Sequence, residues 1–112
     1  MELSVQVVDA RNGFPAAEIG VRLSRETERG WERVACGGTR GDGRLVVARS
    51  PDLPAGNYQL ELNLDDYYAL QGDVPLFPKA VVEFRLGDVG GDLHLPMLIS
   101  PHSILTYRGV PR

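Results

Sequence analysis

The chain has 112 residues, a net charge of −3 at pH 7 and one cysteine. This length supports one hydrophobic core, so we expect a single domain covering residues 1–112. Acidic and basic residues are mixed along the chain, which argues against binding of nucleic acid or of an anionic membrane. A single cysteine excludes an intramolecular disulfide, and no apolar run is long enough to span a membrane. The first residues lack a basic segment followed by an apolar stretch, so export is not expected. These features favour the cytoplasm.

The first half of the chain predicts four short strands separated by turns. Residues 3–9 alternate between the two faces of a strand and end before a turn at residues 11–13. Further strands are expected at residues 20–24, 31–36 and 44–48. Between the second and third strands, a charged loop that ends in Gly30 suits a hairpin. Gly41-Asp42-Gly43 predicts a tight turn, because glycine reaches positive φ without steric cost.

The second half adds four more strands and one short helix. Residues 58–64 alternate between apolar and polar side chains, as in a half-buried antiparallel strand, and Asp65-Asp66 is expected to cap a helix over residues 67–70 that ends at Gly72. The remaining strands are expected at residues 80–86, 93–99 and 104–108. Pro96 lacks a backbone N–H and must therefore face an edge, a bulge or an unpaired gap. About eight short strands with almost no helix predict an all-β fold, a β-sandwich.

Several short motifs make the chain similar to a known family. They are Val8-Asp9-Ala10 with Gly13 and Pro15 after it, Gly41-Asp42-Gly43-Arg44, Gly56-Asn57-Tyr58, Asp66-Tyr67-Tyr68, Phe77-Pro78, His94-Leu95-Pro96 leading into Ser100-Pro101, and Tyr107-Arg108-Gly109. Together they resemble the 5-hydroxyisourate hydrolase branch of the transthyretin-like family. The resemblance implies a transthyretin-like β-sandwich of two four-stranded sheets. It also implies a homotetramer, a dimer of edge-to-edge dimers, around a central channel that contains the ligand sites.

One face of the predicted sandwich carries the candidate site. In the family, the strands that begin near residues 3, 44, 93 and 104 share the sheet that faces the channel. Alternation along each strand then selects the side chains that point to one face. They are Ser4, Gln6, Val8, Arg44, His94, Pro96, Leu98, Leu105 and Tyr107. Gly109 joins this set through the Tyr-Arg-Gly motif.

The resemblance also implies roles for these residues. The family's hydrolases open a ring amide of 5-hydroxyisourate with two histidines, an arginine and a C-terminal Tyr-Arg-Gly-Ser. Such chemistry needs a base to activate water and a cation or donor to stabilise the oxyanion. The matching, predicted catalytic residues are His94, Arg44, Tyr107 and Arg108. The predicted substrate-binding residues are Gln6, Ser4, Val8, Pro96, Leu98, Leu105 and Gly109.

The chain departs from the family pattern at both ends of this site. Gln6 stands where the hydrolases have their first-strand histidine, and an amide takes up no proton near neutral pH. Val110 replaces the terminal serine, and Pro111-Arg112 extend the chain beyond it. Ile104-Leu105 replace an aromatic residue and a small hydroxyl-bearing one. The predicted pocket is therefore more apolar than a hydrogen-bond-rich purine derivative requires.

Individual residues also have structural interpretations. Without the family context, His94 between two leucines is better explained as a sheet histidine, and Arg44 as a solvated strand residue. His102 is expected in a turn, and Cys36 is expected to be a small buried apolar group. With two histidines and one cysteine, the sequence has no zinc-ligand spacing, so neither a metal nor a cofactor is expected.

Three functions follow from these features. The favoured prediction is a diverged enzyme that applies acid/base chemistry to a small cyclic, less polar substrate, as a hydrolase, cyclase or isomerase, in a channel between subunits. A genuine 5-hydroxyisourate hydrolase of purine (urate) catabolism is the alternative, and Gln6 argues against it. The second alternative is a non-catalytic ligand-binding protein like transthyretin. His94 and Arg44 argue against this role, because a carrier needs no acid/base group beside a cation.

Overall fold

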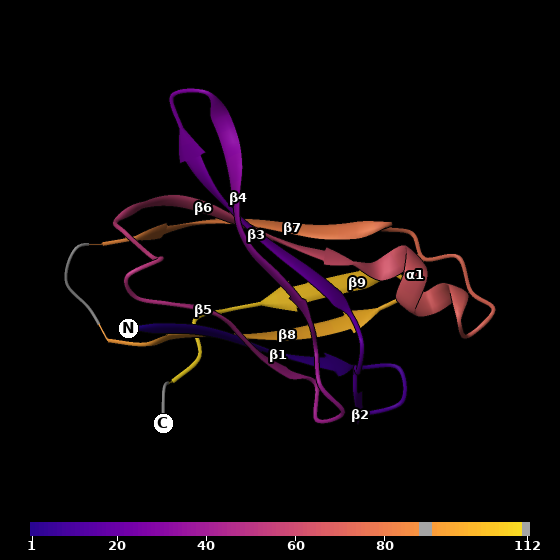
Figure 1. Cartoon of the computed structure of the whole chain (residues 1–112). Helices are drawn as coiled ribbons and strands as arrows, with labels where there is room; N and C mark the ends of the chain where they lie inside the picture. Colours follow the sequence, from indigo (N-terminus) through magenta and orange to yellow (C-terminus); the bar gives the residue numbers. More distant parts are fainter. Residues whose placement is uncertain (88–90, 111–112) are drawn as a thin grey trace.

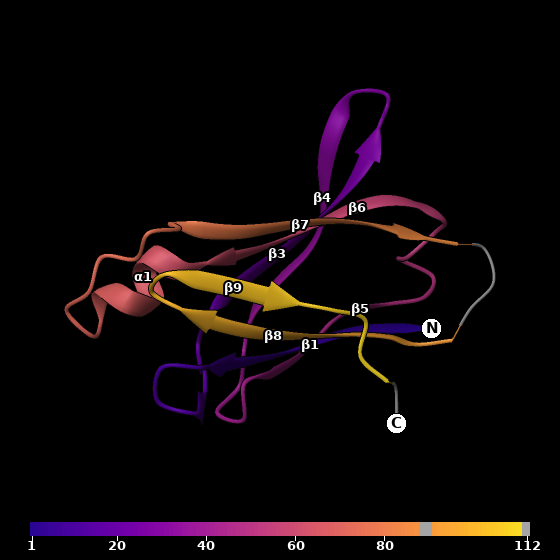
Figure 2. The ribbon, with the colours of Figure 1, turned by 180° about the vertical axis from the view of Figure 1, so that it is seen from behind.

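The computed structural model describes residues 1–87 and 91–110, which form two β-sheets packed face to face and one short helix (Figures 1 and 2). The first sheet contains β1 (Glu2–Asp9), β2 (Phe14–Pro15), β5 (Arg44–Arg49), β8 (Leu93–Ser100) and β9 (Ser103–Thr106). The second contains β4 (Gly30–Gly38), β3 (Gly20–Thr27), β6 (Gly56–Asn63) and β7 (Lys79–Leu86). Helix α1 (Leu64–Ala69) follows β6. The predicted all-β sandwich is confirmed.

Strand β1 is the centre of the first sheet. It pairs in parallel with β8 on one side, and antiparallel with β5 and then β2 on the other. β8 is in turn antiparallel to β9. The two-residue β2, which the sequence analysis did not predict, brings this sheet to five strands rather than four. The four strands expected to carry the candidate site therefore share one sheet.

Alternation along the strands separates the core from the outer face of this sheet. On β1, Leu3, Val5 and Val7 are fully buried, whereas Ser4 and Gln6 are half-buried on the opposite face. β8 repeats this pattern, and its buried residues are Leu93, Leu95, Met97 and Ile99. Burying a large aliphatic side chain stabilises a fold by about 1.5–3 kcal/mol. A register slip of one residue would exchange the two faces, so packing of the core fixes which side chains point outward.

Helix α1 begins earlier than the sequence analysis expected. Asn63 is its N-cap: Asn63 Oδ1 accepts from the backbone N–H of Asp66 at 3.1 Å, and Asn63 Nδ2 donates to Asp66 Oδ2 at 2.8 Å. The prediction that Asp65-Asp66 caps the helix is wrong, because the helix already includes the buried Leu64. The two aspartates instead occupy the first turn, where negative charge favours a helix N-terminus. No helix in the described residues is long and apolar enough to cross a membrane.

Edges and ends of strands account for the other differences. Cys36 is exposed rather than buried, because it lies on β4, an edge strand with no buried residue in its length. β3 and β4 are longer than predicted and form a hairpin that projects from the sandwich (Figure 1). β9 ends at Thr106, so Tyr107 and Arg108 lie beyond the strand that was expected to contain them.

Pro96 lies in β8 at the kind of gap that the sequence predicted. The β8–β9 ladder starts at the pair Met97 and Thr106, one residue after the proline. The Pro96 carbonyl accepts from Thr106 Oγ1 at 3.0 Å, so this residue's backbone groups face β9. The nitrogen without a proton therefore falls where the β8–β9 ladder has ended.

Candidate functional site

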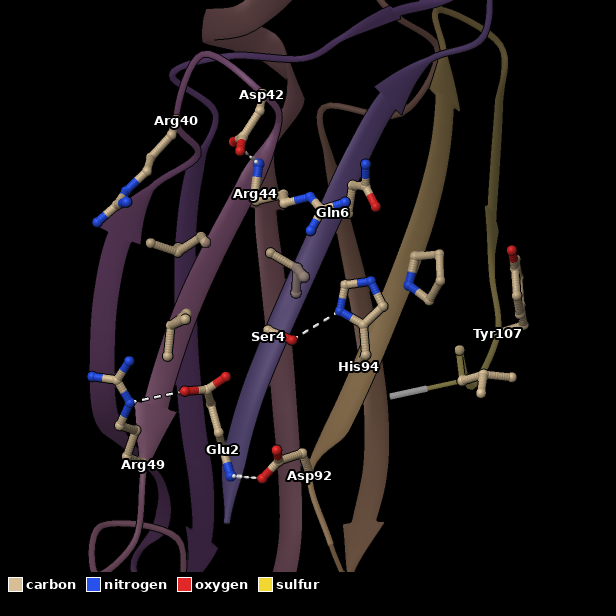
Figure 3. Close-up of a pocket in the computed structure, with 16 residues that line it drawn as sticks. Glu2, Ser4, Gln6, Arg40, Asp42, Arg44, Arg49, Asp92, His94 and Tyr107 are labelled. Atoms are coloured by element: carbon tan, nitrogen blue, oxygen red, sulfur yellow. Dashed lines mark hydrogen bonds and ion pairs between the residues drawn. The ribbon is translucent and has the colours of Figure 1, made fainter. Parts of the chain in front are cut away.

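A groove of about 820 Å³ opens on the outer face of the first sheet (Figure 3). Strands β1, β5 and β8 form its floor, and the segment after β9 lies along one side. Its lining residues are Glu2, Ser4, Val5, Gln6, Arg40, Asp42, Arg44, Leu45, Val46, Arg49, Asp92, His94, Pro96, Tyr107, Gly109 and Val110. The groove thus combines both signs of charge, one imidazole and several aliphatic side chains.

A tight turn places Arg44 beside Gln6. The turn is closed by a hydrogen bond from Gly43 N to Arg40 O at 2.8 Å, and Gly43 has a φ of +77°. A Cβ at residue 43 would lie 2.3 Å from Val7 O, so only glycine allows the turn to approach β1. β5 then pairs with β1 so that Arg44 is opposite Gln6. The predicted glycine turn therefore places the Arg44 guanidinium next to the Gln6 amide.

His94 is held by a side chain from the neighbouring strand. β1 and β8 run parallel with Ser4 opposite His94, and Ser4 Oγ lies 2.8 Å from His94 Nδ1. Either atom can be the donor, depending on the tautomer of the ring. The sequence analysis placed both residues on this face but assigned Ser4 to the substrate. Their contact depends on the register between two strands, which no local pattern reveals.

The C-terminal segment packs closely against His94. Gly109 N donates to His94 O at 2.8 Å. A Cβ at residue 109 would lie 2.8 Å from the ring carbons of Pro96 and 3.1 Å from His94 Cδ2, so the approach requires glycine. This contact brings Tyr107 and Val110 to the groove, although both side chains remain exposed.

Three charged residues at one end of the groove were not predicted from the sequence. Arg49 Nε donates to Glu2 Oε1 at 2.9 Å, and Glu2 N donates to Asp92 Oδ1, also at 2.9 Å (Figure 3). Glu2 precedes Ser4 by two residues, and Asp92 precedes His94 by two. Period-two spacing from Ser4 and His94 was therefore the signal that would have found Glu2 and Asp92. Arg49 does not share the spacing of Arg44, and it lies opposite Glu2 because the register of β1 and β5 shifts between Leu3 and Ser4.

Two arginines of the groove, Arg40 and Arg44, carry positive charges that no described acidic side chain pairs with. Within the described part of the chain, neither Arg40 nor Arg44 forms an ion pair, whereas Arg49 pairs with Glu2. Guanidinium groups bind carboxylates and other oxyanions through paired N–H donors. The groove can therefore hold a negatively charged group near His94. In the described residues, no group of three or more His, Cys, Asp and Glu side chains could hold a metal ion.

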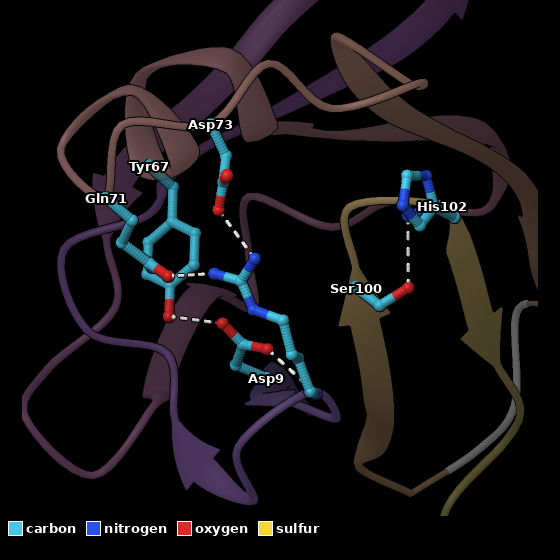
Figure 4. Close-up of polar contacts among 7 residues, drawn as sticks. Asp9, Tyr67, Gln71, Asp73, Ser100 and His102 are labelled. Carbon is cyan, nitrogen blue, oxygen red and sulfur yellow. Dashed lines mark hydrogen bonds and ion pairs between the residues drawn. The ribbon is translucent and has the colours of Figure 1, made fainter.

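Most of the predicted site residues meet in the groove, and four do not. Those that line it are Ser4, Gln6, Arg44, His94, Pro96, Tyr107 and Gly109. Leu98 lies further along the same sheet face, opposite Val8 on β1 and Leu105 on β9. Arg108 is exposed and does not line the groove. His102 is exposed in the turn between β8 and β9, where its backbone N–H donates to Ser100 Oγ at 3.1 Å (Figure 4).

A second polar cluster, the Asp9 cluster, lies at the other end of β1 and comprises Asp9, Arg11, Tyr67, Tyr68, Gln71 and Asp73. Figure 4 shows the hydrogen bonds of Asp9 with Tyr67 and of the Asp73 carboxylate in this cluster. Asp9 is fully buried, and its oxygens accept from Arg11 N at 3.0 Å and from Tyr67 Oη at 3.1 Å. Arg11 Nη1 lies 2.5 Å from Asp73 Oδ2. Burial, and then the Asp9 charge, raise the pKa of Tyr67 and raise that of Tyr68 to about 12. These contacts join the end of β1 to α1.

Comparison with known proteins assigns the chain to a family. The model of the HIUase/Transthyretin family matches residues 3–109. The 5-hydroxyisourate hydrolase of Caulobacter vibrioides is 33% identical over 111 residues, which cover 96% of each chain. The 5-hydroxyisourate hydrolase of Pseudomonas aeruginosa is 34% identical over 113 residues, which cover 96% of this chain and 90% of that protein.

Solved structures agree with this assignment. The structure of Klebsiella pneumoniae 5-hydroxyisourate hydrolase superposes with a TM-score of 0.86 at 35% identity, covering 97% of this chain and 98% of that one. The crystal structure of transthyretin from Sparus aurata gives a TM-score of 0.91 at 32% identity, covering 98% and 97%. The predicted transthyretin-like fold is confirmed. The chain belongs to the HIUase/transthyretin family.

Proposed function

We propose that this protein is an enzyme that has diverged from the 5-hydroxyisourate hydrolases and applies acid/base chemistry to a small cyclic, less polar substrate. The observation that carries this proposal is Gln6, an amide that lies opposite Arg44 on β5 and Pro96 on β8. The sequence has only two histidines, and His102 lies outside the groove. His94 is therefore the single imidazole that this groove offers for proton transfer.

In this proposal His94 is the general acid/base. An imidazole exchanges protons near neutral pH, and a positioned acid or base typically contributes about 10²–10⁴ in rate. The Arg44 guanidinium donates hydrogen bonds to the negative charge that develops on the substrate. Gln6 offers both a donor and an acceptor, so it orients a polar group of the substrate but transfers no proton. The Tyr107 phenol is a further donor at the groove wall.

The apolar part of the groove supports a substrate less polar than hydroxyisourate. Val46 is 40% exposed and Val110 is 88% exposed, and both line the groove together with Pro96. Amides of a purine-derived ring that face these aliphatic side chains would lack hydrogen-bond partners on that side. Hydrolysis, cyclisation and isomerisation of a small ring all remain open, since each requires a proton transfer beside a stabilised anion.

A genuine 5-hydroxyisourate hydrolase of purine (urate) catabolism is the second candidate. The presence of His94, Arg44 and Tyr107 in one groove favours this candidate. Relatives named 5-hydroxyisourate hydrolase, which share about one-third of their residues with this chain, favour it as well. A non-catalytic ligand-binding protein is the third candidate. The likeness to a transthyretin favours it, but a binding role gives no reason for an imidazole near a guanidinium that forms no ion pair with a described residue.

A homotetramer, a dimer of dimers in the cytoplasm, is part of the same proposal. Leu98, Leu105 and Tyr107 are 40%, 51% and 56% exposed on the outer face of the first sheet or just beyond it. A monomer would leave these apolar side chains in water. Covering them with another subunit would turn the groove into one wall of a channel that encloses the substrate. Sedimentation should give a tetramer, and a monomer at micromolar concentration would remove the channel from the proposal.

Freshly generated 5-hydroxyisourate tests the catalytic proposal. We expect the wild-type protein to accelerate its spectrophotometric decay only weakly. Gln6→His should raise the rate by about 10² or more, because it supplies a second titratable imidazole. Gln6→Asn is the matched control, since it keeps an amide and should give no gain. Wild-type hydrolysis as fast as that of a family hydrolase measured alongside would contradict the proposal and support the second candidate.

A further inference from the structure

We propose that Ser4 and Gly109 are positioning residues that hold the His94 imidazole from two sides. The inference rests on the proposed function, in which His94 transfers the proton. Nδ1 and Cδ2 of an imidazole flank the carbon that joins the ring to the rest of the side chain. Ser4 contacts the first of these atoms, and the Gly109 backbone packs against the second.

The Ser4 hydroxyl suits a ring that changes its protonation state. It lies 2.8 Å from Nδ1 and can either accept a hydrogen bond from the ring N–H or donate one to the ring nitrogen. The same hydrogen bond is therefore available to the charged ring and to both neutral tautomers. A carboxylate at this position would accept only, and would favour the charged ring. A hydroxyl keeps the imidazole anchored through a complete acid/base cycle.

Gly109 restricts the opposite edge of the ring. Its N–H donates to the His94 carbonyl at 2.8 Å, which ties the C-terminal segment to the strand that carries the imidazole. The space beside Cδ2 is so narrow that even a Cβ would come within 3.1 Å of this atom. The torsion that rotates an imidazole is otherwise broad. A half-turn of the ring would bring Cδ2 to Ser4 and lose the hydrogen bond, so the two contacts together select one orientation.

Nitrogen-15 NMR of the imidazole rings tests this inference without substrate. The chain has two histidines, and His102→Gln assigns the pair of ring signals. Ser4→Ala should shift the ring nitrogen signals of His94 and leave those of His102 unchanged. Ser4→Thr, which keeps the hydroxyl, should retain the wild-type signals. Gly109→Ala should also shift the His94 signals, because the added carbon displaces the ring or Pro96.

Ser100→Ala is the matched control, because Ser100 lies on the same sheet and accepts from the backbone N–H of His102. It should leave the His94 signals at their wild-type positions. Circular dichroism checks that each variant is folded, and Ser4→Cys, a weak donor of similar size, replaces Ser4→Ala if that variant fails to fold. Unchanged His94 signals in a folded Ser4→Ala protein would overturn the inference. Since ring orientation is measured without turnover, this failure is distinct from a failure of the proposed function.

Discussion

The two polar regions of this protein lie at opposite ends and on opposite faces of β1, and they differ in where their hydrogen bonds go. Asp9 points inward, is fully buried, and has both carboxylate oxygens bound by groups of its own chain. Ser4 and Gln6 point outward into the groove. Within the described residues, the Gln6 amide has no hydrogen-bond partner and Arg44 has no ion-pair partner.

This difference indicates that one polar region stabilises the fold and the other is available to a ligand. A buried polar group must be satisfied by the protein, or it costs the full loss of hydration. Polar groups in an open groove stay hydrated until another molecule replaces the water. The Asp9 cluster therefore stabilises the fold, whereas the groove keeps its donors and acceptors for a ligand. Changes in the two regions should alter different observables.

The largest effect is expected from His94→Ala in the groove. Made in the Gln6→His protein, where hydroxyisourate decay is most easily measured, it should lower the rate by about 10²–10⁴. The free energy of unfolding in urea should fall by about 1 kcal/mol or less, the usual net worth of one hydrogen bond. His102→Ala is the control and should change neither quantity. Unchanged turnover of the His94→Ala protein would show that His94 is a structural residue. It would contradict the view that the groove serves chemistry while the Asp9 cluster serves stability.

Arg44→Ala sharpens the same test, because it removes the cation and leaves the imidazole. It should also lower the rate, by loss of anion stabilisation. The pH–rate profile should keep the change in rate with pH that depends on protonation of His94, since no proton-transfer group has been removed. Loss of this pH dependence in the Arg44→Ala protein would contradict separate roles for Arg44 and His94.

Asp9→Ala should have the converse effect, on stability rather than on rate. It removes the acceptor for Tyr67 Oη and for Arg11 N, and hydrogen bonds to a charged group contribute about 1.5–3 kcal/mol. We expect the free energy of unfolding in urea to fall by about that amount, with the rate per folded molecule unchanged. Asp9→Asn keeps one acceptor oxygen and should lie between Asp9→Ala and wild type. Equal stability of all three proteins would contradict a structural role for the cluster.

Alternation and turn chemistry predicted much of the fold and part of the site. The buried Leu3, Val5 and Val7 and the outward Ser4 and Gln6 follow from period-two spacing alone. Glu2 and Asp92 obey the same spacing, two residues before Ser4 and His94, but neither belongs to one of the family motifs. The helix start was misplaced because two acidic residues suggested a cap, while Asn63 was taken as a polar residue inside the preceding strand.

Contacts between distant parts of the chain could not be predicted in this way. Ser4 and His94 are 90 residues apart, and only the parallel register of β1 and β8 brings them together. Tyr107 reaches the groove although β9 ends before it, because Gly109 docks on His94. Cys36 is exposed because β4 is an edge strand, a property of sheet order that its sequence does not carry. Local sequence patterns thus predict which face of a strand a side chain occupies. The pairing of strands in the folded protein determines which side chains are in contact.

A substitution at Tyr68 should have the smallest effect on the free energy of unfolding at neutral pH. It tests how burial in the Asp9 cluster affects a hydroxyl group. The Tyr68 hydroxyl is buried, and no described residue forms a hydrogen bond with it. Burial, and then the Asp9 charge, raise the pKa of Tyr68 from 10.0 to about 12. The unfolded chain therefore loses this proton before the folded protein does. The stability that depends on Tyr68 is complete below pH 10.0 and is lost as the pH rises through about 12.

Tyr68→Phe isolates this contribution. Removing a hydroxyl that has no partner should leave the free energy of unfolding nearly unchanged at neutral pH. Urea titrations between pH 10.0 and about 12 should then show a shallower loss of stability than in wild type. Some loss should remain, because burial also raises the pKa of Tyr58 and Tyr67. Gln6→Asn, a change on the outer face, should keep the wild-type slope. If Tyr68→Phe keeps that slope too, the fold does not hold the Tyr68 phenol neutral, and burial in the Asp9 cluster affects ionisation less than the geometry indicates.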